Sequence, residues 1–103
     1  MPKIDEILAE RGKVYGDFAG HSIIAQALKD VMRSTAGWGR LAPDMREALE
    51  MDAHKIARTL NGDPTCADNW NDSAGYMKLV GNRLDAEQAS VVLQKPKRRN
   101  GKA

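Results

Sequence analysis

The sequence holds a single cysteine, Cys66, among its 103 residues. One thiol excludes an internal disulfide, and it also excludes zinc sites that are built from cysteine pairs. No apolar run approaches the roughly 20 residues that a membrane-spanning helix needs. The N-terminal segment carries acidic residues where a secretion signal would have an apolar stretch. We therefore expect a cytoplasmic protein.

Aromatic residues make up only 5% of the chain. Strand formers are sparse, and alternation of apolar and polar residues never persists. The motifs GxGxxG and GxSxG are absent, so the glycines mark turns and not a phosphate-binding loop. Helical periodicity recurs instead, and it predicts one all-α domain over residues 1–94, a small bundle of four to five helices. Because short amphipathic helices bury little surface alone, we expect a homo-oligomer.

Basic residues are concentrated at the C-terminal end of the chain. The formal net charge is +2, from 16 basic and 14 acidic residues. Residues 95–103 hold five of the basic residues and no acid, so the remainder has 11 basic and 14 acidic residues, a net charge of −3. This composition predicts a disordered basic tail. Such a tail either solubilises the protein or contacts nucleic-acid phosphates through charge alone.

Glycine and proline divide the domain into segments with helical spacing of apolar residues. We expect a loop at 12–17, with Asp17 as a cap for the helix that follows. A second loop, around Trp38, is rich in glycine. Residues 86–93 form either a further helix or an extension of the one before. The main helices are predicted from Ile4 to Arg11, from Phe18 to Ser34, from Pro43 or Asp44 to Leu60, and from Ala67 or Asp68 to Leu84.

Acidic side chains recur on the polar faces of the last two main helices, at spacings of three and four residues. A short connection would set these helices side by side, so that their carboxylates face one another. Packed carboxylates repel unless a cation joins them, and magnesium prefers oxygen ligands. Lys55 and Arg58 would then hold phosphate oxygens. Tyr76 would either stack on a base or ribose or contact a carboxylate. The predicted magnesium ligands are Glu47, Glu50, Asp68 and Asp72.

The same side chains also have a purely structural interpretation. Glu50, His54 and Arg58 follow one another at i,i+4 spacing, which is typical of paired charges on a solvated helix face. His54 would then be a partner of Glu50 and not a metal ligand. Cations of one helix would also neutralise acids of the next without any metal. The pairs expected on this interpretation are Lys55 and Arg58 with Asp68 and Asp72.

Two further polar residues lie close to the predicted apolar stripes. His21 is near the start of its helix, and we expect it at the surface or in a capping role. Asp52 is beside the apolar stripe of the third main helix, so it lies either at the exposed edge of that stripe or partly buried.

Three segments together resemble a family of small proteins that is common in tailed-phage and prophage genomes. The family pattern opens with ERG…YGDF, continues with a K-I-A-R helix and closes with D…D-x-A-G-Y. The resemblance covers residues 4–84, although Asp52 and Ser73 are polar where the pattern has apolar residues. The segments are ILAERGKVYGDF (7–18), EALEMDAHKIARTLNGDP (47–64) and DNWNDSAGYMKLV (68–80).

This phage family in turn resembles the MazG-like all-α nucleoside triphosphate pyrophosphohydrolases. The resemblance implies a helical dimer or tetramer that binds magnesium through an ExxE motif and an acidic pair on the next helix. Glu47 and Glu50 match ExxE, whereas Asp68 and Asp72 form DxxxD and not ExxD. It also implies cleavage of the α–β phosphate bond of a nucleoside triphosphate, with Glu50 activating the attacking water.

Two functions therefore follow from the sequence. The first is a magnesium-dependent nucleoside triphosphate pyrophosphohydrolase of phage origin. The alternative is a non-catalytic phage protein that binds and modulates a host protein, with the same charged side chains acting as structural pairs.

Overall fold

The computed structural model describes residues 3–94, which form helices and their connections. The all-α prediction is confirmed, since these residues contain no strand. None of their helices is long and apolar enough to cross a membrane. The basic tail predicted at residues 95–103 lies outside the described residues. The elements are α1 (Ile4–Tyr15), α2 (Phe18–Arg33), the short 3₁₀ helix η1 (Ala36–Arg40), α3 (Pro43–Asn61) and α4 (Ala67–Gln94).

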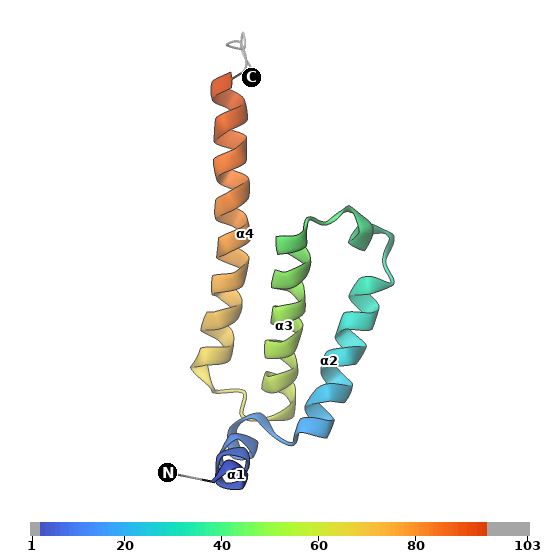
Figure 1. The fold of residues 1–103 in the computed structure, drawn as a ribbon, viewed down its shortest axis with the longest axis vertical. Helices are drawn as coiled ribbons and strands as arrows, with labels where there is room; N and C mark the ends of the chain where they lie inside the picture. The colour runs from blue at the N-terminus through green and yellow to red at the C-terminus, as the bar shows by residue number, and fades with distance from the viewer. Residues whose placement is uncertain (1–2, 95–103) are drawn as a thin grey trace.

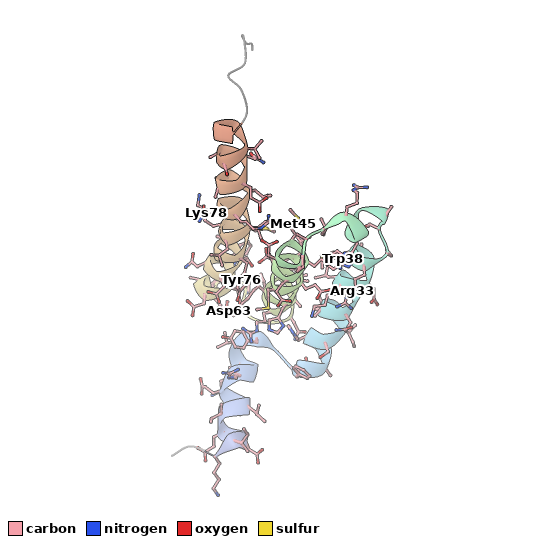
Figure 2. The ribbon with its side chains drawn as sticks, turned by 45° about the horizontal axis from the view of Figure 1, so that its top comes forward. Arg33, Trp38, Met45, Asp63, Tyr76 and Lys78 are labelled. Atoms are coloured by element: carbon pink, nitrogen blue, oxygen red, sulfur yellow. The ribbon has the colours of Figure 1, made fainter. Side chains whose placement is uncertain are left out.

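Three of the helices form an open layer and not a closed bundle. In Figure 1, α3 lies between α2 and α4, and α4 continues well beyond the end of α3. Figure 2 shows α1 projecting away from the ends of the other helices. The radius of gyration is 19.3 Å and the extents are 64 × 32 × 22 Å. A compact chain of this length has a radius of about 13 Å, so this chain is markedly elongated.

Small side chains fill the contacts between the layered helices. The buried apolar residues are Ala25 on α2 and Ala48, Ala53 and Ala57 on α3. No large side chain of the described residues is completely buried. Twelve large apolar side chains among these residues are at least 41% exposed. The helices of the layer are therefore closely packed where they contact one another, whereas large apolar side chains on the two broad sides of the layer are exposed.

The observed helix ends correct one predicted boundary and decide between the two alternatives for residues 86–93. α1 continues through Gly12 to Tyr15, so most of the loop predicted at 12–17 is helical. Gly16, with a φ of 80°, ends α1, and only Gly16 and Asp17 separate it from α2. Asp17 caps α2 as predicted, because its Oδ2 accepts a hydrogen bond from the Gly20 amide at 2.8 Å. Residues 86–93 extend α4, which is a single helix of 28 residues.

The junction of α1 and α2 is fastened to the C-terminal end of α3. The Asn61 side-chain amide donates hydrogen bonds to the carbonyl oxygens of Tyr15 and Asp17, at 3.3 and 2.8 Å. The Asp63 amide donates to the Val14 carbonyl oxygen at 2.6 Å. Gly62 passes so close that a Cβ there would overlap the backbone of α1. These contacts hold the C-terminal half of α1 against α2 and α3.

Candidate functional site

The predicted magnesium ligands lie in different surroundings. Glu50 turns towards α2, where its Oε2 accepts a hydrogen bond from Arg33 Nε at 2.6 Å. Asp72 turns towards α3, with its Oδ2 2.9 Å from Lys55 Nζ. Glu47 lines a groove of about 320 Å³ between α3 and α4. Asp68 is exposed in the first turn of α4. Each carboxylate thus faces its own neighbours and not the other three.

These positions do not suit a magnesium ion. Among residues 3–94, no group of three or more histidine, cysteine, aspartate or glutamate side chains is placed to hold a metal. The hydrogen bond from Arg33 also holds the pKa of Glu50 below its ordinary value. The carboxylate proposed to activate water is therefore already neutralised by a guanidinium. We derive no catalytic step through magnesium from this arrangement.

The remaining predicted site residues are divided between the two sides of α3. Lys55 is buried and pairs with Asp72, as the structural interpretation predicts. Arg58 does not pair with Asp68, but lies against the ring of Tyr15. Tyr76 lines the groove that also contains Glu47. Of the three residues predicted to bind substrate, only Arg58 therefore belongs to the larger pocket described next.

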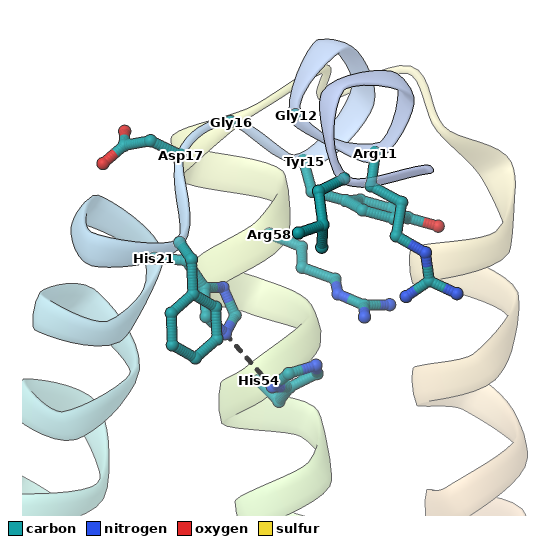
Figure 3. A pocket seen from close by; sticks show the side chains of 10 residues that line it. Arg11, Gly12, Tyr15, Gly16, Asp17, His21, His54 and Arg58 are labelled. Atoms are coloured by element: carbon teal, nitrogen blue, oxygen red, sulfur yellow. Dashed lines mark hydrogen bonds between the residues drawn. The ribbon is translucent and has the colours of Figure 1, made fainter. Parts of the chain in front are cut away.

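A pocket of about 460 Å³ opens where α1, α2 and α3 meet. This volume lies within the range of about 300–1,000 Å³ that is common for small-molecule sites. Figure 3 shows the side chains that line it, contributed by three helices and the short α1–α2 connection. The lining residues are Leu8, Arg11, Gly12, Tyr15, Gly16, Asp17, Phe18, His21, His54 and Arg58.

Two guanidinium groups supply the positive charge of this pocket. The Arg58 guanidinium carbon lies 4.2 Å from the centre of the Tyr15 ring, a cation–π contact that orients it. Arg11 approaches from α1, and Figure 3 shows both guanidinium groups directed into the same space. Neither forms an ion pair with a carboxylate of the described residues. The Asp17 carboxylate points away from them in Figure 3, because it caps α2.

Two histidines form the wall opposite α1. His21 Nε2 and His54 Nδ1 are hydrogen-bonded at 3.1 Å. Burial, together with the charge of Arg58, lowers the pKa of His21 and lowers the pKa of His54 to about 4. Both rings are therefore neutral at pH 7. The surface position expected for His21 is wrong, since the residue is only 6% exposed. The pairing of His54 with Glu50 is also wrong, because each has another partner.

The sequence alone did not predict that the residues lining this pocket lie close together. Arg11 and Tyr15 are four residues apart and share a helix face only if α1 continues through Gly12, which the breaker rule for glycine argues against. Because the predicted helix ended at Arg11, the prediction did not put Arg11 and Tyr15 on the same helix face. Leu8, Arg11 and Tyr15, at spacings of three and four, were the signal that could have identified the helix face.

The pocket lies within a recognised sequence family. Residues 3–84 match the family described as "Domain of unknown function (DUF6378)". The chain belongs to this family. The part that matches DUF6378 contains all ten pocket-lining residues and α4 as far as Leu84. Comparison with curated proteins and with solved structures found no match.

Proposed function

We propose that this DUF6378 protein binds a phosphate-bearing nucleotide in the pocket between α1, α2 and α3. The observation that supports this most directly is the pair of unpaired guanidinium groups, Arg11 and Arg58, in one pocket. By contrast, Arg33 and Arg83 are each neutralised by a carboxylate, whereas no pocket-lining carboxylate pairs with Arg11 or Arg58. Two cations left without an acid in a concave site attract an anion, and guanidinium matches the oxygens of phosphate in geometry.

The rest of the lining suits the remainder of a nucleotide. Stacking on Tyr15 occupies one face of the Arg58 guanidinium and leaves its N–H groups in the guanidinium plane free to donate to phosphate. Phe18 is 79% exposed at the rim, with its ring stacked near His21 at a centroid distance of 6.0 Å. An exposed aromatic ring beside an anion site offers a surface on which a base can stack.

Cleavage of the bound nucleotide stays a prediction that rests on the resemblance to the MazG-like pyrophosphohydrolases. The described carboxylates do not fit the magnesium site that this chemistry uses. Binding is therefore proposed on the geometry of the pocket alone. Release of pyrophosphate from a nucleoside triphosphate is a separate measurement on the same protein.

The second candidate function is binding to another protein. It is favoured by the large apolar side chains on the broad sides of the layer, since exposed apolar patches mark interaction surfaces. This function makes no use of Arg11 or Arg58, so substitutions in the pocket distinguish it from nucleotide binding.

Isothermal titration with each nucleoside mono-, di- and triphosphate, with and without magnesium, tests the proposal. We expect binding by the wild type, and a loss of about tenfold or more in affinity for Arg58→Ala and for Arg11→Ala, because each removes a charge-assisted hydrogen bond. Arg40→Ala is the matched control, since Arg40 is an exposed arginine of η1, which follows the C-terminal end of α2, away from the pocket. Absence of binding by every nucleotide, or equal weakening by Arg40→Ala, contradicts the proposal.

A further inference from the structure

The layer of α2, α3 and α4 has two broad sides of different character. Met51 on α3 and Leu79 on α4 line the same groove, so they mark one side. A helix turns about 100° per residue, so a side chain nine residues away lies on the opposite side of its helix. Leu60 is nine residues from Met51, and Trp70 is nine residues from Leu79. Leu60 and Trp70 therefore share the other side of the layer, which we call the back face.

Four large apolar side chains of the back face are exposed. Ile56 and Leu60 on α3 are 46% and 67% exposed, and Trp70 and Met77 on α4 are 61% and 48% exposed. Lys55 pairs with Asp72 in the antiparallel contact of these helices, which places Ile56 level with Trp70. The Trp70 indole already donates its hydrogen bond to the Pro64 carbonyl oxygen at 2.9 Å. A partner that covers this ring would therefore not leave the indole N–H without a hydrogen bond.

Along α4, the back face follows the spacing of a coiled-coil seam. Residues at alternating intervals of four and three form an uncharged stripe over 22 residues, which is the a/d pattern of three heptads. An added Cβ at Gly81 within this stripe would meet no atom within 4 Å, so none of the described residues packs against it there. The residues of the stripe are Trp70, Ala74, Met77, Gly81, Leu84, Gln88 and Val91.

The stripe continues past the point where another helix of residues 3–94 could cover it. Arg83 binds Asp44, in the first turn of α3, through hydrogen bonds of 2.6 and 2.8 Å. Beyond Arg83, α4 runs on to Gln94, which adds about 16 Å of helix. Figure 1 shows this part of α4 standing clear of α3. Most of the stability of a helix in water comes from packing of its apolar face, so a partner along this part of α4 would stabilise it.

We propose that a second copy of this chain covers the back face, with the uncharged stripes of two α4 helices packed together in a two-fold symmetric dimer. A strip along α4, widened by the adjacent face of α3, presents roughly 700 Å² per copy. This is close to the roughly 800 Å² per partner of a standard stable interface. An uncharged stripe can meet its own copy without like-charge repulsion, which a symmetric contact requires.

The dimer leaves the nucleotide pocket open. Arg58 and His54 are seven and three residues from Met51, so they lie on the groove side of α3 and not on the back face. The inference therefore goes beyond the proposed function, and either of the two can fail without the other.

Size-exclusion chromatography with light scattering on the full chain tests the dimer. We expect a mass of twice 11.3 kDa for the wild type. Met77→Glu places a charge in the seam and is expected to give a monomer. Leu79→Glu is the matched control: Leu79 is 68% exposed, two residues away on the opposite side of α4, and this variant is expected to stay dimeric.

A second measurement protects the test against misfolding. Circular dichroism is expected to show the helix content of the wild type in both variants, and Leu60→Glu on α3 replaces Met77→Glu if that variant loses helix. With Trp38→Phe, Trp70 is the remaining tryptophan, and its emission is expected to shift to the red on dilution. A monomeric wild type, a dimer that survives both Met77→Glu and Leu60→Glu, or a dimer broken equally by Leu79→Glu overturns the proposal.

Discussion

His21 Nε2 lies 3.1 Å from His54 Nδ1, and the two rings meet edge to face with their centres 4.5 Å apart. This contact joins α2 to α3 at the wall of the nucleotide pocket. It requires at least one neutral ring to accept the hydrogen bond, because two imidazolium groups would both be donors and would repel each other. The stability of the protein therefore depends on the protonation of these two side chains.

Acid is expected to destabilise the protein through this pair. The folded-state pKa of His54 is lowered from 6.5 to about 4, so between these values the unfolded chain binds protons that the folded chain excludes. The free energy of unfolding therefore falls as the pH is lowered from about 6.5 to about 4, by about 3 kcal/mol. Urea denaturation at a series of pH values measures this slope. His54→Asn should flatten it, and an unchanged slope in that variant contradicts the assignment.

The charged Asp52 carboxylate is expected to lower the free energy of unfolding at neutral pH. It is 5% exposed, and burial raises its pKa while a hydrogen bond with Ser73 offsets part of the rise. A raised pKa means that ionisation at pH 7 costs stability, and this cost disappears as the pH falls to the ordinary value of 3.8. Asp52→Asn should thus raise the free energy of unfolding at pH 7 by about 1 kcal/mol.

The gain from Asp52→Asn should fade between pH 7 and about pH 4 in urea denaturation. Asp85→Asn, at an exposed position of α4, is the control and should change little at any pH. A loss of stability at pH 7 in Asp52→Asn would show that the charged form of Asp52 is the favoured one.

The ion pair between the buried Lys55 of α3 and the half-exposed Asp72 of α4 should respond unequally to removal of its two partners. The Lys55 side chain is 10% exposed, whereas that of Asp72 is 46% exposed. Asp72→Ala leaves a buried ammonium without a counter-charge and should cost about 2 kcal/mol. Lys55→Met keeps the apolar stem and leaves a carboxylate in partial contact with water, so it should cost less than about 1 kcal/mol.

Urea denaturation of both variants and of the double variant forms a complete cycle for this pair. Adding Lys55→Met to Asp72→Ala should restore part of the lost stability, because it removes the stranded charge. If Lys55→Met is the more damaging of the two single substitutions, the pair does not act as described.

Gly62 is expected to be essential for the junction that forms the pocket. A Cβ there would overlap the Val14 carbonyl oxygen and the Tyr15 backbone, so the connection after α3 would have to move away from α1. Gly62→Ala should lower the free energy of unfolding by about 2 kcal/mol and weaken nucleotide binding. Gly75→Ala, where a Cβ meets nothing within 4 Å, should instead stabilise α4 by about 0.5–1 kcal/mol. Thermal melts and titrations of both variants measure these effects, and equal behaviour contradicts them.

Interactions between residues that are close in the sequence explain which helix ends could be predicted from the sequence. Asp17 caps α2, and α3 begins at Pro43, as the capping and proline rules predict. The same rules ended α1 too early at Gly12, because contacts with α3 hold the helix beyond that glycine. Glu47, Glu50, Asp68 and Asp72 have the spacing of a shared stripe, yet α3 is flanked by helices on two sides. Its acids are therefore divided between different neighbours.

The sequence by itself determined the helices, because caps, breakers and apolar periodicity act over a few neighbouring residues. The sequence also determined which charged side chains are present to form a site. Only the tertiary structure decided which of these groups meet. Arg33 pairs with Glu50, and Lys55 pairs with Asp72. Arg58 shares a pocket with Arg11 and two neutral histidines. The physical reason is that helix spacing fixes the direction of a side chain around its own axis. The identity of the neighbour in that direction depends on how separate helices pack.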